Sequence, residues 1–272
     1  MIQSCWPLHN ARRVLYTIAL VALTVTNAHA DGSKHHPAPR YLNAVKIDWA
    51  ALLAPPPGAD SVQQQRDLQT VLDIQAANHA GERHDKAVAD SEPSCFRFAD
   101  VVGSGFDAGQ LPITAAFLER AASEMNAATG ILKHHWQRPR PFVVSDKVER
   151  FADVAPRNEK EDAASLHSFE YSSYPSGHAT YGMACALLLT QLVPEKQSQL
   201  FQRSIEYSES RLIVGAHFPS DVLAGRIVAT AAMTLMIQSS AFQHDLKAAR
   251  KELQRALVLA KLPEPIAAIT KM

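Results

Sequence analysis

Residues 174–193 read YPSGHATYGMACALLLTQLV, and this stretch decides the fold class. It opens with a proline-led turn and continues into an apolar run from Ala179 to Val193 that contains no charged residue. A bilayer span needs about 20 apolar residues, so this run is too short to cross a membrane and is typical of a helix buried in a protein core. A second apolar stretch, from Val222 to Gln238, carries Arg226 and several small polar residues, and we expect a core helix there too.

Helical patterns continue on both sides of this segment. Downstream, we expect helices over residues 195–212, 219–238 and 240–260. Upstream, apolar residues recur at three- and four-residue steps within residues 62–79 and 111–136, the period of a helix with one buried face. Patterns that alternate between polar and apolar residues, which indicate strands, are nearly absent. The sequence therefore predicts an all-α fold, a single-domain helical bundle.

Two stretches lack a helical period. Residues 81–93 are polar and are expected to form a loop. Residues 142–174 hold many charged residues and serines, and we expect a long loop there that includes one short helix. Long loops in compact domains often carry function.

Composition excludes several classes of protein. The chain has 272 residues, of which 47% are hydrophobic and 20% are charged, so it can bury a sizeable core and is not disordered over most of its length. Lys plus Arg and Asp plus Glu both number 27, and no basic stripe interleaved with aromatic residues stands out. Binding to a nucleic-acid polymer is therefore not expected.

The first thirty residues look like a secretory signal peptide. Arg12 and Arg13 precede an uncharged apolar run from Val14 to Thr26, and Ala28-His29-Ala30 then provides a small-residue cleavage site. We favour export with cleavage over a membrane anchor because the apolar run is too short to span a bilayer. Residues 1–30 would then be the signal peptide, the mature protein would be periplasmic, and residues 31–58, which are rich in proline, would form an N-terminal arm.

Cysteines leave one question open. Cys5 lies in the predicted signal peptide, so an exported protein would keep Cys95 and Cys185. These two residues either form a disulfide, as an oxidising compartment permits, or remain buried free thiols.

Three clusters of residues carry the chemistry. They are Lys133 with Arg140-Pro141, then Pro175-Ser176-Gly177-His178, then Ser210-Arg211 followed by His217 and Asp221. Lys133, Arg140 and Arg211 are cations, and guanidinium forks suit tetrahedral oxyanions. Ser176 and Gly177 stand where the turn opens a helix, so their backbone N–H groups and the helix dipole can bind an anion. Together these residues predict a phosphate site.

The third cluster adds a nucleophile. His217 and Asp221 are four residues apart, so one helical turn places both side chains on the same side. The carboxylate would hold one imidazole nitrogen while the other faces the site, and an imidazole held in this way can attack phosphorus. Pro219 is tolerated only in a first helical turn, which places His217 at the mouth of the helix. His178 is then the candidate acid that protonates the leaving alcohol.

The clusters fit the pattern Lys-x6-Arg-Pro, Pro-Ser-Gly-His, Ser-Arg-x5-His-x3-Asp, and the chain thereby resembles the superfamily of type 2 phosphatidic acid phosphatases and vanadium haloperoxidases. Within it, the chain looks like a bacterial class A nonspecific acid phosphatase over roughly residues 45 to 255. Further stretches that carry this likeness are Leu53-Ala54-Pro55-Pro56-Pro57, Arg138-Pro139-Arg140-Pro141-Phe142, Ser173-Tyr174 before the second cluster, Glu209 before Ser210, and Gly215-Ala216-His217.

The resemblance implies an all-helical fold and the hydrolysis of a broad range of phosphate monoesters through a phosphohistidine, without a metal ion or cofactor and with transfer to alcohols as a side activity. Residues 59–272 would be the helical acid phosphatase domain. Its partners would be small phosphate monoesters; no membrane span would remain after signal cleavage, and a homo-oligomer is left open. The implied roles are phosphate binding by Lys133, Arg140, Ser176, Gly177 and Arg211, nucleophilic attack by His217, orientation of that imidazole by Asp221, and acid catalysis by His178.

Departures from the family pattern are few. Ser172 and Ala179 stand where the family often has Gly and Thr, and Val214 replaces a Cys found in some members. A family disulfide therefore cannot be transferred to this chain.

Other functions for the three clusters compete with a phosphatase. A vanadium haloperoxidase would use the same anion site for vanadate, with His217 as metal ligand, and a non-catalytic phosphate-binding protein would show no turnover. A salt-bridged surface would explain the three cations but not the two histidines and the glycine turn. Gly-x-Ser-x-Gly is absent around Ser176, which disfavours that residue as a nucleophile. Of His134 and His135, consecutive on a helix, at most one can face the site.

Overall fold

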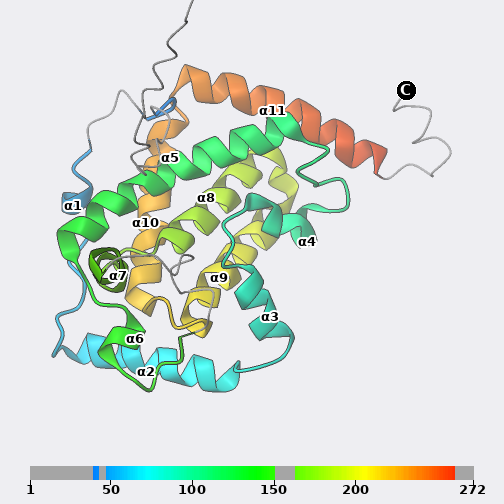
Figure 1. Cartoon of the computed structure of the whole chain (residues 1–272). Coiled ribbons are helices and arrows are strands. Elements are labelled where there is room, and N and C mark those ends of the chain that lie inside the picture. Colours follow the sequence, from blue (N-terminus) through cyan, green and yellow to red (C-terminus); the bar gives the residue numbers. More distant parts are fainter. Residues whose placement is uncertain (1–38, 43–46, 151–162, 261–272) are drawn as a thin grey trace, which may run out of the picture. The chain divides into compact units, whose positions relative to one another are not determined.

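The computed structural model describes residues 39–42, 47–150 and 163–260 (Figure 1). The predicted signal peptide, residues 1–30, lies outside the described residues. Within the described ranges the chain forms helices and no strand, which confirms the predicted all-α fold. The helices are α1 (Trp49–Leu52), α2 (Val62–Ala77), α3 (Glu82–Ala89), η1 (Cys95–Phe98), α4 (Ala99–Val102), α5 (Pro112–Trp136), α6 (Pro141–Val144), α7 (Ala163–Glu170), α8 (Gly177–Leu192), η3 (Pro194–Lys196), α9 (Gln197–Ile213), α10 (Pro219–Met236) and α11 (Ser240–Leu259).

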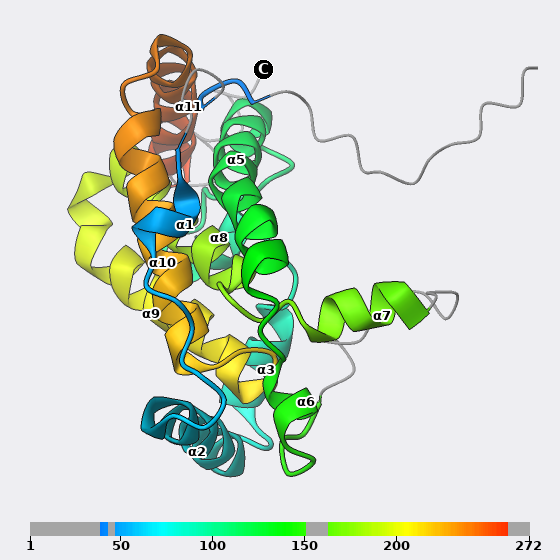
Figure 2. The same cartoon turned by 90° about the vertical axis from the view of Figure 1, so that its left-hand side faces the viewer.

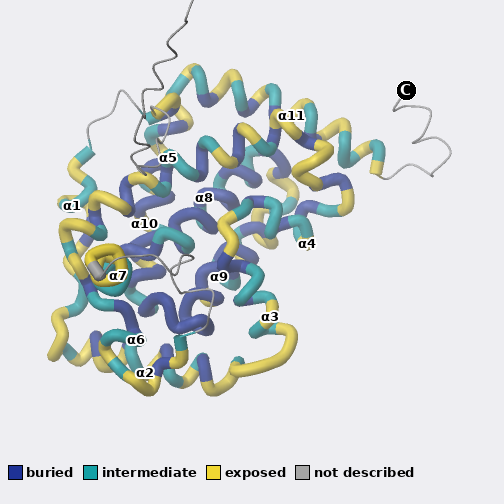
Figure 3. Tube along the Cα trace, in the orientation of Figure 1, coloured by how far each residue is buried: buried dark blue, intermediate teal, exposed yellow. Residues whose placement is uncertain are grey.

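Helix α8 lies at the centre of the bundle. It packs against α5, α9 and α10, and most of its length is buried (Figures 1 and 3). None of its residues is exposed, and Ala184, Cys185, Leu188 and Leu189 are fully buried. The apolar run that decided the fold class is therefore the core helix that the sequence predicts.

Helix α10 approaches the start of α8 very closely at Gly225. A Cβ atom at this position would lie 2.4 Å from the carbonyl oxygen of Ser176 and 3.0 Å from Thr180 Oγ1. Thr180 Oγ1 also donates a hydrogen bond of 3.0 Å to the Gly225 carbonyl. The absent side chain thus lets α10 bring its first turn next to the first turn of α8, where the second and third sequence clusters meet.

The described part of the N-terminal arm is attached to the bundle. Tyr41 is buried against Phe117 and Phe242, and its hydroxyl donates to Asp245 at 2.9 Å. Further along, Tyr174 Oη donates to the carbonyl of Ala54 at 2.7 Å. Figure 2 shows residues 53–61, which include Ala54, running from α1 to α2 along one side of the helices.

One prediction about the loops is wrong. Residues 81–93 include α3, which the sequence analysis assigned to a loop. Its eight residues, ERHDKAVA, include only three apolar ones, which are consecutive at the C-terminal end, so no apolar period marks the helix. Polar contacts with α9 hold it instead: Arg83 donates to Ser210 Oγ at 3.1 Å, and Lys86 Nζ lies 2.8 Å from Glu206 Oε2. Such tertiary contacts stabilise a helix without leaving a hydrophobic pattern.

The long loop is confirmed in its described part, residues 142–150 and 163–174, where α7 is the short helix and α6 adds one turn at Pro141–Val144. The question about the cysteines is settled: Cys95 and Cys185 form a disulfide, with their Cα atoms 5.2 Å apart. Among the described residues, no single helix has the length and hydropathy for a membrane span, and only α10 and α11 taken together, which are bent by 99°, meet both criteria.

Candidate active site

A cavity of about 300 Å³ brings six of the eight predicted site residues together. It lies where the end of α5, the start of α8, the end of α9 and the turn before α10 converge. The predicted residues that line it are Lys133, Arg140, Gly177, His178, Arg211 and His217, and the other lining residues are Pro93, Asn126, Thr129, Phe169 and Tyr181. Asp221 and Ser176 are fully buried and do not line the cavity.

The turn between α9 and α10 presents His217 to the cavity. Gly215 has φ +68°, and a Cβ atom there would lie 2.4 Å from the carbonyl oxygen of Glu149, so only glycine fits this turn. The backbone N–H groups of Ala216 and His217 both donate to the carbonyl of Arg211. Pro219 is the first residue of α10, as predicted, and His217 lies just outside the helix.

The imidazole of His217 lies between an acceptor and a donor. Its Nδ1 is 3.5 Å from Asp221 Oδ2, and its Nε2 is 3.3 Å from Arg140 Nη1. A guanidinium can only donate, so Nε2 must accept there and the ring proton belongs on Nδ1, toward the carboxylate. Burial and the charge of Arg140 lower the pKa of His217 to about 3. At neutral pH the ring is therefore uncharged, with its Nε2 lone pair on the cavity side.

Several groups besides His217 hold Asp221 in place. Its Oδ2 accepts from Ser173 Oγ at 2.6 Å and from the backbone N–H of Phe218 at 2.8 Å, and its Oδ1 lies 2.5 Å from Arg138 Nη1. Burial alone would raise the pKa of Asp221, but the neighbouring His217 and the charge of Arg138 lower it to about 2. The carboxylate is therefore ionised and rigidly oriented when it meets the imidazole.

Arg138, for which no role was predicted from the sequence, holds Asp221 in place. This side chain is 4% exposed and also donates from Nη2 to Gln64 Oε1 at 2.6 Å and to Asp67 Oδ2 at 3.1 Å. It thus ties α2 to Asp221 across the base of the site. The only signal in the sequence was its place two residues before Arg140, in a stretch that resembles the family.

Arg140 is held by backbone carbonyls. Its Nε donates to Phe169 O and its Nη1 to Ala216 O, both at 2.9 Å, and its guanidinium stacks 4.2 Å from the centroid of the Phe169 ring. Lys133, from the last turn of α5, donates to the carbonyl of Ser172. These contacts fix both cations without neutralising them.

The described lining of the cavity is electropositive. No residue that lines it within the described ranges is an Asp or a Glu. Burial and the charges of Arg140 and Arg211 hold the pKa of Lys133 well below its usual range, and burial and Arg211 likewise lower that of Arg140. The cations repel one another in a desolvated site, and a bound polyanion would relieve this repulsion.

His178 lies in the first turn of α8, with its Nε2 2.8 Å from the backbone carbonyl of Ser91. A carbonyl can only accept, so Nε2 carries a proton. Burial and the charge of Arg211 lower the pKa of His178 well below 6.5, while the Ser91 carbonyl opposes this shift. These effects keep the ring neutral near pH 7.

The two motif residues before His178 differ in position. Ser176 caps α8, because its Oγ accepts from Ala179 N at 3.2 Å, and its own N–H donates to the carbonyl of Asp221 at 3.0 Å. Gly177 lines the cavity, and a Cβ atom there would lie 3.3 Å from Asn126 Oδ1. Of this pair, only Gly177 thus presents its surface to the cavity.

Neither His134 nor His135 lines the cavity; both side chains are exposed. Within the described part of the chain, no group of three or more His, Cys, Asp or Glu residues is arranged to hold a metal ion.

Comparison with known proteins agrees with this site. Residues 115–245 match the model of the PAP2 superfamily. The chain is 33% identical to the acid phosphatase of Zymomonas mobilis, covering 79% of this chain and 78% of that protein. It is 33% identical to the non-specific acid phosphatase of Providencia stuartii (77% and 82% covered) and 29% identical to that of Salmonella typhimurium (89% and 92% covered).

The matched region holds Lys133, Arg140, His178, Arg211, His217 and Asp221. All three of these relatives are named acid phosphatases. By its sequence, its helical fold and this constellation, the chain belongs to the PAP2 superfamily, among its non-specific acid phosphatases.

Proposed function

We propose that this acid phosphatase hydrolyses phosphate monoesters through a covalent phosphohistidine on His217, without a metal ion, after export to the periplasm. The observation that carries the proposal is the placement of His217: its Nε2 lone pair faces a cavity lined by Lys133, Arg140 and Arg211, while Asp221 lies behind the ring. A neutral, oriented imidazole next to an anion site is the arrangement that nucleophilic attack on phosphorus requires.

Substrate binding would use the three cations that line the cavity. The phosphoryl oxygens would receive charge-assisted hydrogen bonds from Lys133, Arg140 and Arg211, with the N-terminus of α8 at Gly177 adding its dipole. Because Lys133 and Arg140 are already fixed by backbone carbonyls, little reorganisation of these two groups would accompany the reaction. Such preorganised charge is usually the largest single contribution to catalysis.

The proposed reaction has two steps. First, His217 Nε2 forms a bond to phosphorus while the bond from phosphorus to the ester oxygen breaks, and His178 donates a proton to the departing alcohol. Second, a water molecule attacks phosphorus as His178 takes its proton, the N–P bond breaks, and orthophosphate leaves. Asp221 stabilises the positive charge that the His217 ring acquires in the first step.

His178 must hold an extra proton for the first step, although its surroundings in the protein favour the neutral ring. Two features of a bound ester oppose that neutral state. The phosphate charge offsets the effect of Arg211 on the imidazole, and below pH 6 a monoester, whose second pKa is about 6, also brings a proton that it can pass to the imidazole. Both effects favour turnover in the acid range.

The chemistry of the lining supports metal independence. Divalent cations prefer carboxylate and carbonyl oxygens, whereas the described lining presents ammonium and guanidinium groups. In this site positive charge would come from the side chains themselves. Vanadate, a phosphate mimic, would bind the same groups and act as an inhibitor.

Broad specificity and phosphotransfer follow from the rest of the lining. Outside the phosphate-binding cluster the described cavity is lined by uncharged residues, among them Pro93, Asn126, Thr129 and Tyr181. Recognition would thus rest on the phosphoryl group and not on the alcohol. An added alcohol such as glycerol could replace water in the second step and give its phosphate ester.

The first experiment is hydrolysis of p-nitrophenyl phosphate by the chain from Asp31 onward, at pH 4 to 8, with EDTA and with vanadate. We expect EDTA-resistant, vanadate-inhibited activity, and an acid-labile phosphoenzyme after quenching with labelled substrate. His217→Ala should abolish both, whereas His134→Ala, which alters an exposed histidine next to Lys133, should retain them. Loss of activity with EDTA that added metal restores, or a phosphoenzyme in His217→Ala, would refute the mechanism.

Export is tested separately. Expression of the full chain in a Gram-negative host, followed by osmotic shock, should release active protein whose N-terminal residue is Asp31. Retention of uncleaved protein in the membrane fraction would contradict the proposed signal peptide.

A further inference from the structure

The residue that joins two parts of the site is Ser91, which no sequence motif includes. Its side-chain Oγ accepts a hydrogen bond of 2.7 Å from Arg211 Nη1, while its backbone carbonyl lies 2.8 Å from His178 Nε2. Ser91 itself is buried, at 9% exposure. One residue thus contacts both a proposed phosphate-binding group and the proposed general acid.

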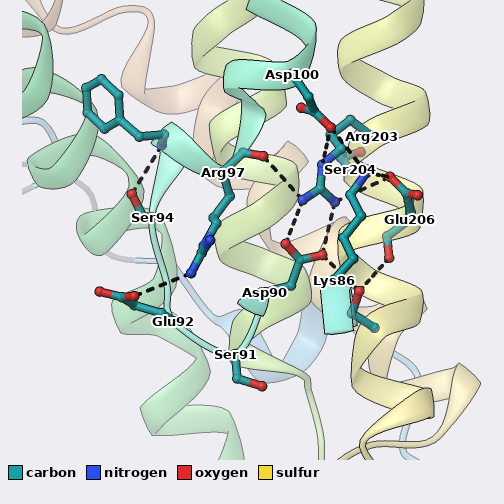
Figure 4. Close-up of polar contacts among 12 residues, drawn as sticks. Lys86, Asp90, Ser91, Glu92, Ser94, Arg97, Asp100, Arg203, Ser204 and Glu206 are labelled. Carbon is teal, nitrogen blue, oxygen red and sulfur yellow. Dashed lines mark hydrogen bonds and ion pairs between the residues drawn. The ribbon is translucent and has the colours of Figure 1, made fainter. Parts of the chain in front are cut away.

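The backbone on the α3 side of Ser91 is fixed by its neighbour Asp90. This carboxylate is fully buried and binds both ends of the Arg203 guanidinium, at 2.6 and 3.0 Å. Ser210 Oγ also donates to it, at 2.9 Å. Figure 4 shows the Asp90–Arg203 pair, with Ser91 next along the chain. It also shows Lys86, which forms ion pairs with Asp100 and Glu206.

The backbone on the other side is fixed by a covalent bond. Four residues after Ser91, Cys95 is joined to Cys185 in the middle of the core helix α8. Between these anchors, Pro93 lines the cavity. The segment Asp90–Cys95 therefore runs from a buried ion pair on α9 to a disulfide on α8, passing His178 and Arg211 on the way.

We propose that Ser91 is a positioning residue of this phosphatase: its hydroxyl holds the Arg211 fork toward the phosphate, and its carbonyl holds His178 with Nδ1 left for the leaving group. This proposal rests on the proposed function of Arg211 and His178. In this respect Ser91 does for His178 what Asp221 does for His217, because each places an oxygen acceptor behind one ring nitrogen.

The two functions of Ser91 can be separated by substitution. Ser91→Ala removes the hydroxyl and keeps the carbonyl. Hydrogen bonds to charged groups are worth about 1.5 to 3 kcal/mol, which is more than a factor of ten in affinity. We therefore expect Ser91→Ala to raise KM for p-nitrophenyl phosphate and Kd for inorganic phosphate by about tenfold, while kcat and its pH profile change little.

Two variants show whether the effect is specific. Ser91→Thr restores a hydroxyl and should recover most of the lost phosphate affinity. Ser94→Ala is the matched control, because Ser94 lies in the same segment and its hydroxyl bonds only to Phe96 N among the contacts of the described residues. Ser94→Ala should leave KM, kcat and Kd as they are in the unmodified enzyme.

A double-mutant cycle identifies the pathway. If Ser91 acts through Arg211, Ser91→Ala should add nothing to the loss of phosphate affinity in Arg211→Lys. Unchanged Kd in Ser91→Ala, equal losses in Ser91→Ala and Ser94→Ala, or full additivity with Arg211→Lys would each overturn the proposal. Calorimetric binding of inorganic phosphate requires no turnover, so failure of the phosphohistidine mechanism would be seen separately, as phosphate binding without a phosphoenzyme.

Discussion

Removal of the Cys95–Cys185 disulfide should destabilise this enzyme strongly. The bond closes a loop with a sequence separation of 90 residues. In the chain-entropy description, a cross-link of that span stabilises the folded state by about 4.5 kcal/mol, mainly by restricting the unfolded chain. Domains are typically stable by only about 5 to 15 kcal/mol. At roughly 2 to 4 °C per kcal/mol for a chain of this size, the midpoint of thermal unfolding should fall by roughly 10 to 18 °C.

The assay compares the chain from Asp31, prepared under oxidising conditions, with its Cys95→Ser/Cys185→Ser variant, each melted with and without a phosphine reductant. The unmodified protein should lose stability in the reductant, and the variant should melt at the lower temperature in both buffers. Because Cys95 anchors the segment that carries Ser91, the variant, assayed below its melting temperature, should also show a raised KM. Two titratable thiols in the unreduced, denatured protein would refute this reasoning, as would equal melting temperatures.

Further predictions concern single groups of the site and the fold. His178→Ala should slow phosphoenzyme formation far more with alkyl phosphates than with p-nitrophenyl phosphate, whose leaving group needs no proton; equal losses in rapid-quench measurements would count against an acid role. Arg138→Met should lower the free energy of unfolding in urea by about 3 to 5 kcal/mol, because it removes the guanidinium that pairs with two buried carboxylates; a change below about 1 kcal/mol would contradict this. Gly225→Ala should also destabilise the fold, by about 1 to 3 kcal/mol, since its Cβ would lie 2.4 Å from a backbone oxygen; an unchanged melting curve would show that α8 and α10 can separate freely. The pKa of His217 is lowered to about 3 in the fold but is near 6.5 in the unfolded chain, so the unfolded state binds more protons between these two values. His217 alone should therefore lower stability by up to about 1.4 kcal/mol for each pH unit below 6.5, and by less with saturating phosphate; melting temperatures that rise toward pH 4 would oppose this.

Much of the fold could be predicted because its helices carry their own signals. The predicted segments 62–79, 111–136 and 219–238 correspond to α2, α5 and α10 within a few residues. Each has a start signal, Ser61 as N-cap or Pro as a first-turn residue. In α2 and α5 a helical apolar period follows this signal, and in α10 a largely apolar run follows it. Helix α3 failed this test because polar contacts with α9, distant in sequence, hold it in place.

The residues that touch the cavity could be predicted better than those that hold them. His217 and Asp221 are a local pair, so a helical spacing is enough to bring them together. Arg138, by contrast, reaches Asp67 and Asp221 from a non-helical stretch, and their positions are 71 and 83 residues away from it in the sequence. Contacts at such separations depend on how helices pack, and no spacing rule applies to them.

Ser91 illustrates the same limit at the site itself. Its carbonyl works through the backbone, so the residue type at position 91 says nothing about His178. Ser91 is one of many serines in the chain, so its hydroxyl does not stand out in the sequence. This hydroxyl reaches Arg211 because the segment that carries it is anchored at both ends, by Asp90 to α9 and by Cys95 to α8. The sequence clusters therefore specify which groups meet the phosphate, while buried ion pairs and the disulfide determine how rigidly those groups are held. The predicted separation between phosphate affinity and turnover in Ser91→Ala is the direct consequence of this division.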